Sequence, residues 1–520
     1  MSAALQIVIF PLADLYWLSW IAIAPLIIAL LRARRAGALA LDGAVKLAPA
    51  SPWQGFLLAY ACGVLWSGGT CYWVFDTMHR YGGLPVAAAG FVLLLFCLYI
   101  GLYHGLFGFL LALAAAPRES LRRPLVAAPF LWVAVELARA RITAFPWELL
   151  GYAQTSNVAL TRIATLTGVY GLSFEILLVN TAFAAGFLVH KSRRTSLLLA
   201  AVAAGLVLQS GQWIKTGWVA PPDRAALLLQ PNLPIEAEWT SNYFQSTVAE
   251  LAQLSLSSDM QSGAGQAGRH YDPIVWPESP SPFFSNDVRF RDPVSALARQ
   301  TGSWMVAGEI GVAPPAESGS QRSLIYNSAA LISPQGEWTV RYDKVHLVPF
   351  GEYLPFPQVF GFAGGLTKEV GEFQHGRTRR ILEADGMRLG TFICYESIFP
   401  DEIRRFARDG AQVLINISND GWYGDSGAWA QHIQQTRMRA IENDRWLLSA
   451  TNTGLTAAID PLGRIAAEVP RKQRTVLVAP YRLQSETTFY TRHGDWFALV
   501  CAIISVGALA TKYASPMVRQ

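Results

Sequence analysis

The apolar positions of this 520-residue chain follow two patterns. Before residue 215 and after residue 494 they form long segments, and a helix needs about 20 mostly apolar residues to cross a bilayer. Between these limits, short apolar runs alternate with helix-like stretches. The long segments predict seven membrane-spanning helices, at Leu15–Leu31, Trp53–Phe75, Pro85–Ala115, Pro124–Ala138, Leu166–His190, Ser196–Trp213 and Trp496–Thr511.

The segment from Arg224 onward predicts a separate layered α/β domain, because β-like runs and helix-like stretches alternate along it. Several of the runs are continuously apolar, which is typical of central strands covered on both faces. The predicted strands are Ala225–Gln230, Pro273–Trp276, Trp304–Ala307, Ser328–Ile332, Arg388–Cys394, Gln412–Ile417 and Leu447–Ala450. The predicted helices are Ile235–Leu254, Val294–Arg299, Pro400–Arg408 and Ala428–Asn443. We expect a membrane helix bundle over residues 1–214, a catalytic α/β domain over 222–485 and a C-terminal transmembrane helix over 494–513.

The first residues add no complete span to this pattern. Met1–Phe10 is apolar, but at 1.5 Å per residue it covers about 15 Å, half of the hydrocarbon core. Two alternatives stay open: the N-terminus is exported, or an eighth helix is shortened or missing at its start. The segment does not resemble a cleavable signal peptide with a small-residue cleavage site.

The basic residues predict how the helices are oriented. The chain is 52% hydrophobic and only 15% charged, its net charge is +5, and it has no Lys/Arg-rich run of the kind that indicates nucleic-acid binding. Short loops rich in Lys and Arg favour the cytoplasm. The first, third and fifth loops are the basic ones, through Arg32, Arg34, Arg35, Lys46, Arg118, Arg122, Arg123, Lys191, Arg193 and Arg194. The polar domain is therefore expected on the opposite side of the membrane.

Three ionisable residues of the polar domain each follow a strand-like run. They are Glu278 in Trp-Pro-Glu, Lys344 in Tyr-Asp-Lys, and Cys394, the only cysteine of this domain. A lone cysteine forms no disulfide within its domain, which leaves a buried inert thiol or a nucleophile. Taken singly, Glu278 could cap a turn and Lys344 could be a solvated surface residue. In the order Glu, Lys, Cys they indicate covalent acyl chemistry.

These three motifs resemble those of the nitrilase (carbon–nitrogen hydrolase) superfamily. The wider pattern resembles its membrane-embedded apolipoprotein N-acyltransferase family, through Lys344–Tyr353, Phe145-Pro146-Trp147 before Gly151-Tyr152, Gln230-Pro231-Asn232 and Ser418–Gly424. That family normally has eight transmembrane helices, so the N-terminal region departs from it. The resemblance implies an α-β-β-α sandwich on the helix bundle and a ping-pong acyl transfer.

Residue by residue, the resemblance makes Glu278 the general base, Lys344 the oxyanion stabiliser and Cys394 the nucleophile. The supporting positions that match are Glu352, Tyr395 and Glu396 around the site, and Trp239 on a substrate-contacting arm. We expect no cofactor and no metal. His432 is interpreted as structural, because no second His or Cys lies at ligand spacing in its helix.

The family's acyl donor is a phospholipid, typically the sn-1 chain of phosphatidylethanolamine, and its acceptor is the N-terminal diacylglyceryl-cysteine of a lipoprotein. The expected partners are therefore that phospholipid, diacylated apolipoproteins and the bilayer, and the expected location is a bacterial inner membrane with a periplasmic catalytic domain. The apolar loop Phe356–Gly376 is interpreted as a mobile lid that touches lipid.

The sequence leaves two alternatives to acyl transfer. A membrane-tethered nitrilase-type amidase would use the same three residues. A non-enzymatic scaffold or transporter with a decayed domain is disfavoured, because all three residues and Glu352 are intact.

Overall fold

The computed structural model describes residues 1–35, 47–115, 121–188, 191–211, 213, 219–235, 237–257, 271–279, 282–314, 323–354 and 373–514. The chain divides into two compact units. The helical unit comprises Met1–Phe75, Val86–Thr216 and His493–Gln520, and the α/β unit comprises Asp76–Pro85 and Gly217–Arg492.

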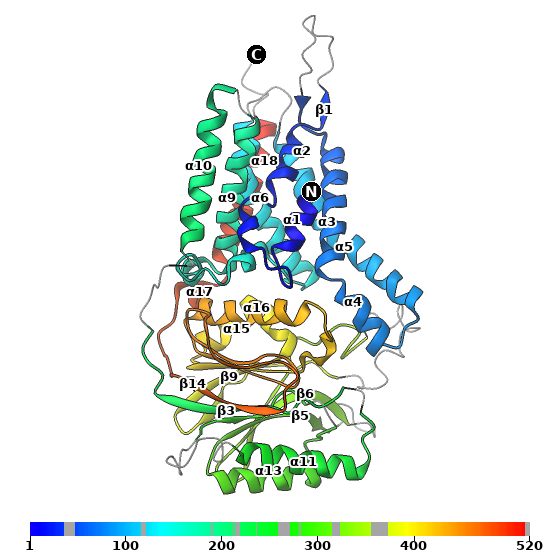
Figure 1. The fold of residues 1–520 in the computed structure, drawn as a ribbon, viewed down its shortest axis with the longest axis vertical. Helices are drawn as coiled ribbons and strands as arrows, with labels where there is room; N and C mark the ends of the chain where they lie inside the picture. Colours follow the sequence, from blue (N-terminus) through cyan, green and yellow to red (C-terminus); the bar gives the residue numbers. More distant parts are fainter. Residues whose placement is uncertain are drawn as a thin grey trace, which may run out of the picture. The chain divides into compact units, whose positions relative to one another are not determined.

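The helical unit consists of apolar helices (Figure 1). Within the described residues, two of them are long and apolar enough to cross a membrane, α5 (Val86–Ala114) and α9 (Val169–Leu188). The predicted number of seven spans stays a prediction. The remaining longer helices are α3 (Pro52–Thr70), α6 (Arg122–Ala138), α10 (Lys191–Ser210) and α18 (Trp496–Ala514). The shorter elements are α1 (Ser2–Val8), η1 (Tyr16–Trp20), α2 (Ala24–Leu31), α4 (Trp73–Asp76), η3 (Arg139–Thr143), η4 (Leu150–Gln154), α7 (Val158–Thr161), α8 (Ala164–Thr167), and the paired strands β1 (Arg34–Arg35) and β2 (Leu47–Ala48). Helix α17 (Phe489–His493) belongs to the α/β unit except for its last residue.

The predicted helix Leu15–Leu31 is interrupted in its middle. The 3-10 helix η1 ends at Trp20, and α2 begins at Ala24. The break is stabilised by Asn180 of α9, whose side-chain oxygen accepts the backbone N–H groups of Ile23 and Ala24 at 2.8 and 2.9 Å. Those donors have no partner inside α2 itself, because the first turn of any helix leaves its N–H groups unpaired.

The α/β unit contains two six-stranded sheets in its described residues (Figure 1). The strand order of the first sheet is β14-β3-β4-β5-β6-β7, and that of the second is β13-β12-β11-β10-β9-β8. The first sheet is formed by β3 (Arg224–Gln230), β4 (Ile274–Val275), β5 (Met305–Ala313), β6 (Leu324–Ile332), β7 (Trp338–Asp343) and β14 (Thr475–Tyr481). The second is formed by β8 (Leu382–Ala384), β9 (Met387–Ile393), β10 (Val413–Ser418), β11 (Leu447–Thr451), β12 (Thr456–Ile459) and β13 (Ile465–Val469).

Strand β3 shows how the layers are built. Ala226 and Leu228 lie in the core between the two sheets, whereas Leu227 and Leu229 lie in the core under the helices, as the two-residue period of a strand requires. Figure 1 shows α11 and α13 over one outer face and α15 and α16 over the other, so the expected α-β-β-α sandwich is confirmed. Their bounds are α11 (Ser241–Leu256), α13 (Val288–Thr301), α15 (Pro400–Arg408) and α16 (Ala428–Asn443).

The continuously apolar runs are confirmed as central strands, since every residue of β10 and β11 is buried and both pair in parallel. Helix α11 begins later than predicted, because Thr240 caps it by accepting the Tyr243 N–H at 3.2 Å. The predicted strands do not include β8, β12, β13 and β14, and β7 was indicated only as the strand-like run before Lys344. Of these, β13 is largely half-buried or exposed and β8 has three residues, so neither presents a long apolar run.

The carboxyl ends of the strands lead into the segments that carry chemistry. Glu278 follows β4, Lys344 follows β7 and Cys394 follows β9. Glycine at position 308 of β5 permits the close approach of the Glu278 segment, because a Cβ there would lie 2.2 Å from the Pro277 carbonyl oxygen. The sandwich therefore brings three segments, far apart in sequence, to one place.

Candidate active site

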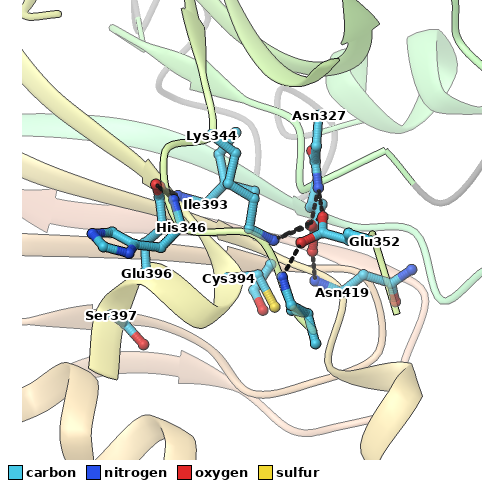
Figure 2. A network of polar contacts seen from close by, with 12 residues as sticks. Asn327, Lys344, His346, Glu352, Ile393, Cys394, Glu396, Ser397 and Asn419 are labelled. Atoms are coloured by element: carbon cyan, nitrogen blue, oxygen red, sulfur yellow. Dashed lines mark hydrogen bonds and ion pairs between the residues drawn. The ribbon is translucent and has the colours of Figure 1, made fainter. Parts of the chain in front are cut away.

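Lys344 is the centre of a buried ionic network (Figure 2). Its side chain is 1% exposed, and its Nζ lies 3.2 Å from Glu278 Oε1 and 3.0 Å from Glu352 Oε1. Burial lowers the pKa of Lys344, but the carboxylates of Glu278 and Glu352 together raise it by more, so its pKa lies above the usual value. The ammonium is therefore charged throughout the physiological pH range.

The two carboxylates are fixed by neutral donors as well. The Nδ2 of Asn327, on β6, donates to Glu278 Oε1 at 2.7 Å and to Glu352 Oε1 at 2.5 Å. The Asn419 N–H donates to Glu278 Oε2 at 2.8 Å, and the Val348 N–H donates to Glu352 Oε2 at 2.7 Å. Glu278 thus keeps one oxygen on Lys344 and the other on the backbone that follows β10.

Cys394 stands on a sharp turn between β9 and the 3-10 helix η6 (Cys394–Ile398). Its φ angle is +49°, a left-handed conformation that non-glycine residues rarely adopt. The thiol is buried, and burial followed by the Glu278 charge raises the pKa of Cys394 well above its usual value, with Lys344 acting in the opposite direction. The resting group at neutral pH is therefore a thiol, and a base is needed to convert it into a nucleophile.

Glu396 connects the cysteine turn to the lysine segment. One carboxylate oxygen accepts the Tyr342 hydroxyl at 2.7 Å and the N–H groups of Val345 and His346 at 2.7 and 3.1 Å. The other oxygen accepts the Ile393 N–H at 2.8 Å. All four neighbours are donors, so the geometry suits an ionised carboxylate although burial raises the pKa of Glu396. Glu396 therefore holds the segments of Lys344 and Cys394 in register.

Replacing Glu396 with glutamine is expected to destabilise the α/β unit by about 2 kcal/mol, because the new amide donor faces a backbone N–H and leaves it unsatisfied. We also expect faster hydrogen exchange of the Val345 and His346 amides. Exchange and thermal unfolding of the full chain measure both effects. The matched control is Glu383→Gln, since Glu383 is 68% exposed and its ion pair with Arg388 spans 3.7 Å. The control should change stability by less than about 0.5 kcal/mol, and equal effects of the two substitutions would contradict the assigned role of Glu396.

A second buried cluster contacts the backbone of the cysteine turn. His432 of α16 places Nε2 at 3.1 Å from the Cys394 carbonyl oxygen and at 2.8 Å from Ser397 Oγ. Its Nδ1 lies 3.1 Å from Asp420 Oδ1. The atoms of Cys394, Asp420 and His432 that could bind a metal ion, namely the thiol sulfur, a carboxylate oxygen and a ring nitrogen, all lie within 4.8 Å of one another. The sequence held no signal for this cluster, because its members lie on η6, on η7 (Asp420–Tyr423) and on α16.

The remaining predicted site residues are placed less centrally. Tyr395 is buried and packs edge-to-face on Phe399 at 5.3 Å. The ring of Trp239 contacts Tyr243 at 4.9 Å and Phe283 at 6.3 Å, in the core beneath α11 and α13. Of the predicted lid Phe356–Gly376, the positions up to residue 372 lie outside the described residues.

Comparisons with known proteins agree with this architecture. Residues 239–489 match the carbon–nitrogen hydrolase family, and residues 2–182 match the apolipoprotein N-acyltransferase N-terminal domain. The apolipoprotein N-acyltransferase of Geobacter metallireducens is 34% identical over 510 residues, which are 96% of this chain and 92% of that protein. Those of Methylococcus capsulatus and Pseudomonas syringae pv. tomato are 36% and 30% identical, over 87% and 88% of both chains respectively.

The similarity extends through both units rather than through the α/β unit alone. The match at residues 2–182 falls on the helical unit except for residues 76–85. Identity above 30% over nearly the full length of both proteins therefore settles the assignment: the chain belongs to the apolipoprotein N-acyltransferase family.

Proposed function

We propose that this enzyme moves an acyl chain from a membrane phospholipid to the α-amino group of the N-terminal diacylglyceryl-cysteine of a lipoprotein, through a thioester on Cys394. The observation that carries the proposal is the buried ammonium of Lys344, held between Glu278 and Glu352 and interacting electrostatically with the Cys394 thiol. In an apolipoprotein N-acyltransferase, these groups are the ones that acyl transfer needs.

The first half of the reaction forms the thioester. Glu278 takes the thiol proton of Cys394 as the sulfur attacks the ester carbonyl carbon, and the negative charge moves to the carbonyl oxygen, where Lys344 stabilises it. The carbon–oxygen bond of the ester then breaks. The leaving alkoxide takes the proton back from Glu278 and departs as lysophospholipid, which leaves the acyl group on sulfur.

The second half transfers the acyl group to nitrogen. The acceptor amine attacks the thioester carbonyl, Glu278 takes a proton from that nitrogen, and the carbon–sulfur bond breaks. The sulfur recovers a proton from Glu278 and the product amide leaves. This ping-pong scheme divides one exchange between two bulky lipids into two steps with a stored activated intermediate.

Glu352 supports Lys344 rather than the reacting atoms. It shares the ammonium with Glu278, and its other oxygen is held by the Val348 N–H at 2.7 Å. A lysine fixed in this way costs little reorganisation when the oxyanion forms, which is the main source of such electrostatic stabilisation. We infer that Glu396 and Tyr395 support the cysteine turn, and that Trp239 lies on a substrate-contacting arm.

The membrane setting belongs to the same proposal. The domain limits are residues 1–214, 222–485 and 494–513, with seven spans and the catalytic domain on the periplasmic side of the inner membrane. The basic segments Arg32–Lys46, Arg118–Arg123 and Lys191–Arg194 support this orientation. Both substrates are lipids, so a bilayer-bound enzyme meets them within the plane of the membrane.

Phosphatidylethanolamine is the proposed donor. An amidase that acts on soluble substrates gives no reason for a helical unit that matches this family.

The proposal is tested by intact-protein mass measurement of the full chain in liposomes. The liposomes contain phosphatidylethanolamine with an isotope label in the sn-1 chain, and no acceptor is present. We expect a labelled acyl group on Cys394 that neutral hydroxylamine removes. Added diacylated lipopeptide should then collect the label as an amide.

A parallel sample carries the label in the sn-2 chain only and should give an unlabelled adduct. Hydrolysis of soluble amides without any acylation of the protein would overturn the proposal and favour the amidase. Acylation from every phospholipid except phosphatidylethanolamine would overturn the donor assignment alone.

A further inference from the structure

The cluster of Asp420, His432 and Ser397 beneath Cys394 has no part in the mechanism above. Each of these residues is at most 3% exposed, so bulk water does not satisfy their polar atoms. Burying a histidine and an aspartate costs free energy unless the two are paired. His432 connects this cluster to the backbone of the nucleophile, because its Nε2 lies 3.1 Å from the Cys394 carbonyl oxygen.

The neighbours of His432 define its protonation state. Nδ1 faces the Asp420 carboxylate and Nε2 faces the Cys394 carbonyl, each at 3.1 Å. A carbonyl oxygen and an ionised carboxylate only accept hydrogen bonds. The third neighbour, the Ser397 hydroxyl at 2.8 Å from Nε2, can donate or accept a hydrogen bond. The imidazolium is the one form of the ring that donates to both the Asp420 carboxylate and the Cys394 carbonyl. Burial lowers the pKa of His432, but Asp420 raises it by more, so its pKa lies above the usual value, in agreement with the geometry.

The hydrogen bond from His432 to the Cys394 carbonyl oxygen fixes the direction of the following N–H group, that of Tyr395. In a planar trans peptide the C=O and the N–H point in opposite directions. A carbonyl held toward α16 therefore sends the Tyr395 N–H to the opposite side of that peptide. Where a nucleophile stands on a sharp turn after a strand, the N–H of the following residue commonly donates to the oxyanion.

We propose that Asp420 and His432 are positioning residues that hold the Cys394–Tyr395 peptide so that the Tyr395 N–H donates to the oxyanion together with Lys344. This inference rests on the proposed thioester mechanism and assigns Asp420 and His432 to the support of its oxyanion site. The imidazolium bond also holds the left-handed Cys394 turn, whose φ of +49° is otherwise unfavourable.

The test measures single-turnover thioester formation in the full chain with labelled phosphatidylethanolamine. His432→Leu removes the donor to the Cys394 carbonyl, so the Tyr395 N–H is no longer held toward the oxyanion. Thioester formation should slow about 100-fold, the usual effect of losing one oxyanion donor, with the KM for phospholipid unchanged. His432→Gln keeps a neutral N–H and should lose about tenfold. Two controls should stay within about threefold of the wild type. Ser397→Ala removes the other partner of Nε2, and Thr436→Val is an isosteric change at a buried position of the same helix.

A pH series separates positioning from general packing. The groups that face His432 are Asp420, Cys394, Ser397, Tyr423 and, through space, Glu278. The ratio of wild-type to His432→Gln rates should be highest at low pH and fall as rising pH removes the imidazolium proton. Asp420→Asn should move that fall to lower pH, because the counter-charge is gone.

Three results would overturn the inference. They are wild-type rates in His432→Leu, an increase in KM alone, and a pH-independent ratio of the two rates. Equal losses in Thr436→Val would also overturn it, since they would show a packing role. Failure of the wild type itself to form a thioester would instead refute the underlying mechanism.

Discussion

Replacing Cys394 with serine is expected to lower acyl transfer by about 10⁴-fold or more and to abolish the hydroxylamine-sensitive acyl mass. Burial and Glu278 already raise the pKa of the thiol well above its usual value. An alcohol in the same place is a far weaker acid, so Glu278 cannot deprotonate it at a useful rate. The side chain is nearly isosteric, and membrane insertion should be unchanged.

Intact mass after exposure to labelled phosphatidylethanolamine, followed by turnover with a diacylated lipopeptide, measures the effect. Cys97→Ser serves as the matched control, because Cys97 is also buried but lies in α5, outside the α/β unit. It should keep most of the wild-type rate. If Cys394→Ser retained a tenth of the activity or more, another group would have to be the nucleophile.

Replacing Lys344 with methionine is expected to slow thioester formation by about 10³-fold, because the oxyanion loses its charge partner. The same change leaves Glu278 and Glu352 buried without their ammonium, and breaking a buried ion pair in this way costs about 3–5 kcal/mol of stability. Single-turnover acylation and thermal unfolding record the two effects separately.

The double variant Lys344→Met with Glu352→Gln distinguishes the two roles of Lys344. Removing one uncompensated carboxylate should recover part of the stability, whereas acylation should stay low because the charge at the oxyanion is still absent. Lys472→Met is the control for loss of a lysine at an exposed position, since Lys472 is 52% exposed. Normal thioester build-up in Lys344→Met would show that the oxyanion role is wrong.

In the sequence, Glu278, Lys344 and Cys394 each follow a strand-like run, whereas Glu352 is identified through the family resemblance alone. The structure joins Glu278, Lys344 and Glu352 by contacts within 3.2 Å, and their membership of the site and their chemical roles stay proposals. Asn327 was not predicted, although it bonds both carboxylates. An asparagine inside a strand is uncommon, and this is the one feature of the sequence that could have identified Asn327 as a site residue. Its partners depend on which strands pair, and local pattern does not contain that information.

Local sequence pattern also could not predict the interruption before α2 or the contact of His432 with Cys394. The break before α2 depends on Asn180, which lies 157 residues away from Ile23 in the chain. His432 meets Cys394 because α16 packs over the second sheet, a contact between elements 38 residues apart. Local periodicity identifies elements, whereas these contacts arise only once the elements have packed.

The two carboxylates around Lys344 affect how well the Cys394 thiol resists oxidation between turnovers. One ammonium beside two anions gives the pocket no excess positive charge, so the sulfur keeps its proton until a substrate arrives. Peroxides and disulfides react with exposed thiolates far faster than with neutral, enclosed sulfhydryls. We therefore expect Cys394 to resist sulfenic-acid formation and mixed disulfides in an oxidising compartment, where an accessible cysteine of low pKa would be lost.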